Sequence, residues 1–150
     1  MAVTDAGDTP RGIYPMLYAF FTAEGALDRP AMRRQVQACL RNGAHGLAVL
    51  GLATEVNKLA DAERRQLVEW VAEELDGRLP FAVTVNAATV DEQAGFAHFA
   101  QSCGASWVIL QPPPERNVAE DFFIRFFGAV ADRVAVAVRT RDRHRRQVVR

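Results

Sequence analysis

The chain has 150 residues with no formal net charge at pH 7, and 49% of its residues are hydrophobic. This length is sufficient for about one globular domain with a sizeable core, whereas a complete eight-stranded α/β barrel needs about 250 residues. The balanced charge argues against a dedicated nucleic-acid-binding or membrane-surface protein. No apolar run in the sequence is long enough to cross a membrane.

Two features indicate the cellular compartment. The start of the chain, MAVTDAGDTPRG, lacks the apolar core of a secretory signal. Cys39 and Cys103 lie far apart in the sequence and have no spacing typical of a zinc site or a disulfide framework. We therefore expect a cytoplasmic location and no metal site.

The first expected elements are a leader, a strand and a helix. Residues 1–11 lack a hydrophobic pattern and are predicted to form a flexible leader. The aromatic-rich run Gly12–Phe21 predicts a first strand, with an irregular first half because Pro15 has no N–H for a ladder hydrogen bond. A helix should follow, since Asp28 is a good N-cap and Pro30 is tolerated in a first turn.

The middle of the chain repeats this pattern. The apolar run Gly46–Gly51 predicts a second strand that is buried on both faces, as in a parallel sheet. A helix is expected from about Asp61, and Phe81–Val85 predicts a third strand. Thr89 and Glu92 have the spacing of a capping box, which predicts the start of another helix.

The last expected elements complete five strand–helix repeats. Ser106–Gln111 predicts a fourth strand, an aromatic helix is expected over residues 122–130, and Val134–Val138 predicts a fifth strand. This alternation is typical of consecutive βαβ units in an α/β fold with a parallel sheet. From residue 139 to residue 150 the sequence is rich in arginine and has no core pattern, so we expect a separate tail there.

The loop after the second strand carries the most promising chemistry. Glu55 follows this strand, where parallel α/β folds place ligand-contacting groups, and it either caps N–H groups of the loop or acts in catalysis. Thr54 offers a hydroxyl and a backbone N–H at the same position. Lys58, the only lysine in the chain, either neutralises Glu55 or points to solvent. No sequence feature indicates the desolvation that an imine-forming lysine needs.

Three motifs, in one order, carry a family resemblance. Gly12–Phe21 resembles G-I-x-P-x-L-x-T-P-F, Gly51–Glu55 resembles G-[TS]-[TS]-G-E, and Leu59–Arg64 resembles L-[ST]-x-x-E-R. Together they are similar to the N-terminal part of the dihydrodipicolinate synthase / N-acetylneuraminate lyase family, and the similarity continues to about Val138. The resemblance implies a TIM (β/α)8-barrel fold of which only about the first five βα units are present, over residues 12–138.

The resemblance also implies a function. Members of this family are class I aldolase-type lyases, usually homo-oligomers, that act on pyruvate or another 2-oxo acid through a lysine Schiff base. They use neither a metal nor an organic cofactor. The resemblance therefore implies a small-molecule 2-oxo acid as the ligand of this chain, a homo-oligomeric state, and no nucleic-acid or membrane partner.

The family's substrate-binding loop matches this chain only in part. Gly51 and Glu55 match the motif. Leu52 replaces the relay hydroxyl and cannot pass a proton, Ala53 keeps only a backbone N–H of the second hydroxyl position, and Thr54 replaces the second glycine. These five residues are the predicted substrate-binding residues, with the backbone groups of Ala53 and Thr54 facing the substrate carboxylate.

No catalytic residue is predicted within the chain. The family's Schiff-base lysine would lie beyond Arg150, and the tyrosine-containing end of the fifth strand is replaced by Arg139 and its neighbours. We therefore expect the chain as given to be inactive. The alternative is a non-catalytic partial barrel that serves as a binding or assembly module.

The change of composition after Val138 has two explanations that the sequence leaves open. An arginine-rich ending directly after a recognisable strand is what a truncated or frameshifted GC-rich reading gives. An evolved tail is the other explanation, because arginine patches also contact nucleic acids. The nucleic-acid interpretation is the weakest of the functional hypotheses, since the expected helices and strands carry no basic stripe.

Overall fold

A computed structural model describes residues 11–115 and 118–140. The four helices are α1 (Arg29–Arg41), α2 (Asp61–Leu75), α3 (Val90–Ser102) and α4 (Glu120–Ala131). The four strands are β1 (Leu47–Val49), β2 (Phe81–Val85), β3 (Trp107–Leu110) and β4 (Ala137–Thr140). Nearly all of the predicted leader and residues 141–150 of the predicted tail lie outside the described residues.

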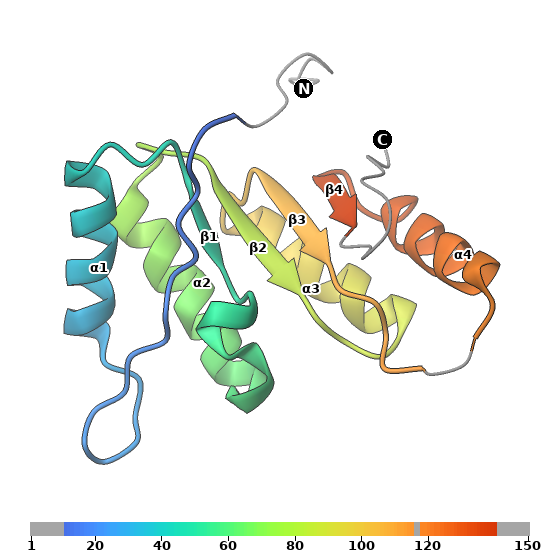
Figure 1. The fold of residues 1–150 in the computed structure, drawn as a ribbon, viewed down its shortest axis with the longest axis horizontal. Helices are drawn as coiled ribbons and strands as arrows, with labels where there is room; N and C mark the ends of the chain where they lie inside the picture. Colours follow the sequence, from blue (N-terminus) through green and yellow to red (C-terminus); the bar gives the residue numbers. More distant parts are fainter. Residues whose placement is uncertain (1–10, 116–117, 141–150) are drawn as a thin grey trace.

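The strands form one parallel sheet in chain order, β1-β2-β3-β4, with a helix between each pair of neighbours. The ribbon shows the helices following the sheet in the same order (Figure 1). The sequence therefore predicted the order and type of these elements correctly. Among the described residues, no helix has the length and hydropathy needed to cross a membrane.

The helix starts follow from local hydrogen bonds. The Asp28 carboxylate accepts a bond of 2.9 Å from the N–H of Ala31 at the start of α1. At α3, the Thr89 hydroxyl accepts from the N–H of Glu92, and the Glu92 carboxylate accepts from the N–H of Thr89. Both predicted caps are confirmed, and each satisfies N–H groups that have no partner inside the helix.

The predicted first strand is reduced to an isolated bridge to β1, and the irregular first half that Pro15 predicted is confirmed. Gly12–Phe21 runs beside β1 with a single parallel bridge, in which Leu17 donates to the carbonyl of Ala48 and Ala48 donates to the carbonyl of Pro15. The next ladder bond would need an N–H on Pro15, which proline lacks. At the other end the ladder stops because Leu50 turns into a left-handed conformation with φ 63°.

The last strand also differs from its prediction. Residues 134–138 were expected, but β4 begins at Ala137 and ends at Thr140. The N–H groups of Arg133 and Val134 still bond to the carbonyls of Val130 and Ala131, so these residues complete the turn after α4. The strand thus includes the first two residues of the segment that was expected to be the tail.

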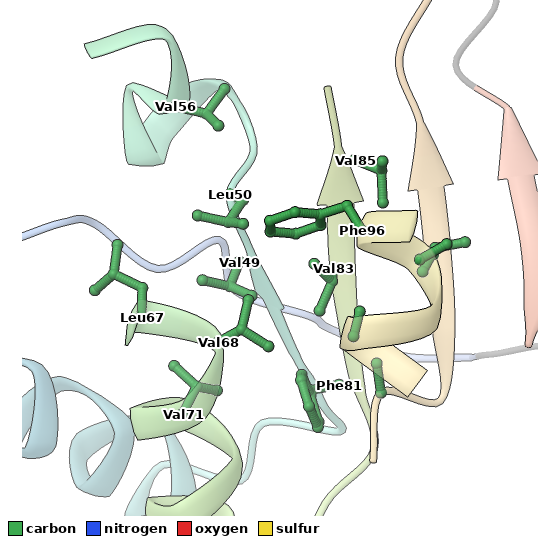
Figure 2. Packing of buried hydrophobic residues seen from close by; sticks show 14 of the residues in the cluster. Val49, Leu50, Val56, Leu67, Val68, Val71, Phe81, Val83, Val85 and Phe96 are labelled. Atoms are coloured by element: carbon green, nitrogen blue, oxygen red, sulfur yellow. The ribbon is translucent and has the colours of Figure 1, made fainter. Parts of the chain in front are cut away.

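The two faces of the sheet are buried differently. The face toward the helices carries Leu47, Val49, Val83 and Val108, each with no exposed surface, and these side chains pack with residues of all four helices. Figure 2 shows part of this cluster, in which Val68 and Val71 of α2 point toward the strands. We call this side of the sheet the helical face.

The opposite side of the sheet, which we call the inner face, carries small residues. Ala48, Ala82 and Trp107 form a separate cluster to which Tyr14, Met16 and Ile109 contribute. The Tyr14 and Trp107 rings meet edge to face, with centroids 5.0 Å apart. Gly46, just before β1, leaves the space for the Tyr14 ring, because a Cβ there would lie 1.8 Å from the Tyr14 Cε1.

Candidate functional site

The rim of the sheet at the end of β1 is formed by a strained loop. Leu50 and Glu55 both have positive φ values, 63° and 55°, which non-glycine residues rarely adopt. Such strain occurs preferentially at functional sites. Between them, Gly51 packs closely on Met16, because a Cβ there would lie 2.2 Å from the Met16 Cε and the methionine side chain would have to shift. We call residues 50–58 the rim loop.

Two short 3₁₀ turns make up most of the rim loop, over Leu52–Thr54 and Val56–Lys58. In the first turn, Thr54 donates to the carbonyl of Gly51 and Glu55 donates to the carbonyl of Leu52. Among the described residues, the backbone N–H groups of Leu52 and Ala53 have no acceptor. Both residues are exposed, so these two donors are available to a ligand.

Thr54 does not present its polar groups to the rim. Its side chain is buried, and its hydroxyl donates to the carbonyl of Leu17 with an oxygen–oxygen distance of 2.5 Å. Its N–H is used by the bond to Gly51. Within this first turn, the exposed free donors are therefore those of Leu52 and Ala53, and the exposed side chains of these two residues are apolar.

Glu55 and Lys58 form an exposed pair, with 2.9 Å between the Glu55 Oε1 and the Lys58 Nζ. Glu55 makes no capping hydrogen bond, so the capping interpretation of this residue is wrong. Lys58 is 73% exposed and does neutralise Glu55. An exposed pair of this kind contributes little to stability, and the lysine lacks the desolvated surroundings of a nucleophilic amine.

Amide side chains tie the rim loop to the loops after β2 and β3. Asn86 donates through Nδ2 to the Oδ1 of Asn57 at 2.9 Å. Gln93, which is fully buried, donates through Nε2 to the carbonyls of Ala87 and Gln111, each at 2.9 Å. These bonds connect the carboxyl ends of three neighbouring strands, where barrel folds build their sites.

A cavity of about 460 Å³ opens at the ends of β1 and β2. Arg64 lines it and donates to the carbonyls of Leu59 and Asn86. Arg65 also lines it, pairs with Asp61 and lies over the ring of Phe96. Arg64 thus links the loop before α2 to the loop after β2, and Arg65 pairs within the first turn of α2.

The two cysteine thiols and the imidazole of His45 lie in surroundings that favour structural roles. Burial raises the pKa of the Cys39 and Cys103 thiols, which disfavours the reactive thiolate. The Nδ1 of His45 accepts a hydrogen bond from the N–H of Ile13. Among residues 11–115 and 118–140, no three His, Cys, Asp or Glu side chains gather in a group that could hold a metal.

The rim loop was predicted from the sequence, but the amide side chains that connect it to the neighbouring loops were not. Asn57, Asn86 and Gln93 were not singled out, although Asn86 directly follows β2, the position that the rule for parallel sheets indicates. The predicted orientation of Thr54 also differs from the structure, since its hydroxyl and N–H are both used inside the protein. The arrangement as a whole can accept a small anion on backbone N–H groups.

Known proteins match the chain over most of its length. YagE of Escherichia coli K12 is 30% identical over 127 residues, which are 85% of this chain and 42% of that protein. L-2-keto-3-deoxyarabonate dehydratase of Azospirillum brasilense is 30% identical over 142 residues, 91% of this chain and 46% of the enzyme. The chain thus spans less than half the length of these curated relatives.

Solved structures share the fold. The crystal structure of YagE, a prophage protein of the dihydrodipicolinic acid synthase family in complex with pyruvate, matches with a TM-score of 0.81 and 29% identity, over 86% of this chain and 43% of that chain. N-acetylneuraminate lyase from Mycoplasma synoviae matches with a TM-score of 0.80 over 87% of this chain and 46% of that one. At 16% identity, the latter match shows the fold alone.

These matches explain the open sheet. The chain covers about 44% of the TIM barrels to which it is similar, and its four parallel strands are part of such a barrel. The predicted fold class is therefore confirmed. The model of the dihydrodipicolinate synthetase family matches residues 9–135. This chain belongs to the dihydrodipicolinate synthetase family.

Proposed function

We propose that this chain carries the carboxylate-binding rim of a class I aldolase-type lyase. In this proposal the N–H groups of Leu52 and Ala53 donate hydrogen bonds to the carboxylate of pyruvate or another 2-oxo acid, and Gly51, Thr54 and Glu55 shape the loop around it. The observation that carries the proposal is the pair of exposed, unused N–H groups in the first turn of the rim loop. Pyruvate in the crystal structure of the related YagE supports the choice of ligand.

We propose further that these 150 residues do not form the Schiff base on their own. Imine formation needs a neutral amine held beside the bound carbonyl. Lys58, the only lysine, is exposed and paired with Glu55. Without the imine, the transition state of aldol cleavage or addition loses its main stabilisation.

Trapping with borohydride tests this second part. The purified chain is incubated with pyruvate and sodium borohydride, and its intact mass is measured. We expect no covalent adduct, while a family member that contains the lysine serves as the positive control. A stoichiometric pyruvate adduct on this chain would contradict the proposed inactivity.

A non-catalytic assembly role, with a homo-oligomer as its product, is the alternative function. It is supported by the outer edge of the Gly12–Phe21 segment, where the backbone groups of Tyr14 and Met16 have no partner among the described residues. Unpaired strand edges favour association with further strands. Sedimentation velocity over a range of concentrations tests this role: reversible dimers would support it, and a monomer at every concentration would count against it.

We also propose a cytoplasmic location for this chain. Its support is that both cysteines are free thiols, as in proteins of reducing compartments. Fractionation of cells that express a tagged chain would check it, and recovery outside the cytoplasm would contradict it.

A further inference from the structure

Thr54 has the most unusual surroundings of any polar residue in the rim loop. Only three polar side chains are buried in the part of the chain that the structure describes, namely Thr54, Thr84 and Gln93. The Thr54 hydroxyl crosses from the rim loop to the Gly12–Phe21 segment, where it donates to the carbonyl of Leu17. This bond joins residues that are 37 positions apart in the sequence.

The rim loop needs such a restraint. Leu50 and Glu55, on either side of the first 3₁₀ turn, both have left-handed backbone conformations that oppose the preference of side-chain-bearing residues. A three-residue turn has little stability of its own, because few hydrogen bonds are formed for the residues that are fixed. The buried side chains of Leu50, Thr54 and Val56 hold this segment against the body of the protein. The bond between Asn57 and Asn86 ties its end to the loop after β2.

The free N–H groups lie within the same turn. Leu52 and Ala53 precede Thr54 directly, and the bond from Thr54 to Gly51 closes the turn that contains them. If the turn opens, these two donors no longer point in one common direction. The hydroxyl bond thus acts on the candidate ligand groups through the backbone, without contacting the ligand itself.

We propose that Thr54 is a positioning residue, whose hydroxyl holds the first turn of the rim loop closed so that the Leu52 and Ala53 N–H groups donate together to one anion. This inference rests on the proposed function for its ligand, but the closure of the turn stands on the structure alone. It also assigns the only hydroxyl of the loop to a bond inside the protein. The rim loop therefore binds an anion and has no side-chain hydroxyl free for proton transfer.

Three variants separate the hydroxyl from the size of the side chain. Thr54→Val removes the hydroxyl at nearly constant volume, Thr54→Ser keeps it, and Thr54→Ala differs from Thr54→Ser by the oxygen alone. Thr84→Val is the matched control, because Thr84 is equally buried on the inner face of β2 and makes no hydrogen bond to the rim loop. The Ala–Ser pair keeps the test decisive if Thr54→Val does not fold.

Amide hydrogen exchange measures the closure of the turn. We expect the Thr54 and Glu55 N–H groups to exchange about tenfold faster in the Val and Ala variants, as expected when one buried hydrogen bond is lost. Exchange should be close to wild type in Thr54→Ser and Thr84→Val. Equal exchange in Thr54→Ser and Thr54→Ala would overturn the proposed closure.

Pyruvate titration followed by ¹⁵N chemical shifts measures the positioning. We expect the shifts of Leu52 and Ala53 to saturate at severalfold higher pyruvate concentration in Thr54→Val than in Thr54→Ser. If pyruvate shifts neither amide in the wild type, the proposed function fails, while the exchange experiment still decides the closure. If exchange accelerates and pyruvate affinity is unchanged, the turn opens without consequence and the positioning role is wrong.

Discussion

The helical face and the inner face of the sheet are stabilised to different degrees. Val108 and Leu110 of β3 lie on the helical face and are completely buried there in the cluster that includes helix residues. Trp107 and Ile109, from the same strand, point to the inner face, where the cover consists of Tyr14 and Met16. Because side chains alternate along a strand, one short segment samples both environments.

The two faces of the sheet also differ in what they contribute, because one holds most of the hydrophobic core and the other lies beside the candidate site. The helical face carries the larger of the two hydrophobic clusters, and burial of apolar side chains is the main favourable term in folding. The inner face and the rim above it are where barrel enzymes of this fold build their sites. The packing of the helices and the candidate site therefore depend on different faces of the same strands.

Adjacent residues of β3 give the largest expected contrast. Leu110→Ala should lower the free energy of unfolding by about 3 kcal/mol, because it leaves a cavity in the completely buried helical face. Ile109→Ala should cost about 1 kcal/mol, since Ile109 is only half-buried on the inner face. Urea denaturation followed by circular dichroism measures both values.

Equal costs for the two variants would contradict the proposed difference in stabilisation between the two faces. They would mean that a partner covers the inner face in solution as tightly as the helices cover the other face. Such a result would favour the assembly role over the carboxylate-binding role of the rim loop.

A glutamine of α1 covers part of the backbone edge of the Gly12–Phe21 segment, beside β1. Tyr18 donates its N–H to the Oε1 of Gln35 at 2.9 Å, and the Nε2 of Gln35 donates to the carbonyl of Tyr18 at 3.1 Å. Gln35→Leu removes both bonds and should lower the free energy of unfolding by about 1–2 kcal/mol. It should also strengthen self-association in sedimentation velocity, because the freed groups form an unpaired strand edge.

Gln37→Leu is the control for this variant. Gln37 lies on the same helix and has a single long contact of 3.5 Å to Glu74. If both variants associate and unfold alike, the amide of Gln35 does not protect the edge.

The link between the rim loop and β2 should have a smaller effect. Asn86→Ala removes the donor to Asn57, and we expect a loss of about 0.5–1 kcal/mol because this bond is exposed. Asn57→Asp keeps an accepting oxygen and should be nearly neutral. Hydrogen exchange of residues 56–58 reports the local effect, and faster exchange in Asn57→Asp than in Asn86→Ala would contradict the link.

The smallest effect concerns the cysteines beneath the helical face. Burial raises the pKa of Cys39 and Cys103, so each thiolate fraction at pH 8 is lower than that of an exposed cysteine. Both should react severalfold more slowly with a disulfide reagent than glutathione does, and unfolding in urea should remove the difference. Fast reaction of either thiol in the folded chain would show that its helix opens readily.

Local signals in the sequence predicted much of the fold. Asp28 and Thr89 fixed helix starts through bonds to N–H groups a few residues away, and the apolar run Phe81–Val85 is a strand with the bounds expected. The first strand could not be predicted reliably, because its pairing depends on the turn at Leu50, which is 35 residues from Pro15 in the chain.

The site could be predicted less well than the fold. The rim loop was found through a family motif and its place after a buried strand, but the motif did not reveal which groups are free. Thr54 was expected to face the ligand, whereas its hydroxyl bonds to Leu17, a contact between segments that no local pattern encodes. The ties through Asn57 and Gln93 are of the same non-local kind.

The proposed function depends on a rim loop that binds a carboxylate through backbone N–H groups. The most direct measurement is the pyruvate affinity of Leu52→Pro and Leu52→Ala, followed through the ¹⁵N shift of the Ala53 amide. Proline at residue 52 deletes one donor, and it fits there because Gly51 is already extended with ψ −166° and a first helical position tolerates proline. We predict that Leu52→Ala binds pyruvate as the wild type does and that Leu52→Pro binds at least several times more weakly. Equal affinity in the two variants, or no shift of Ala53 in either, would contradict the account.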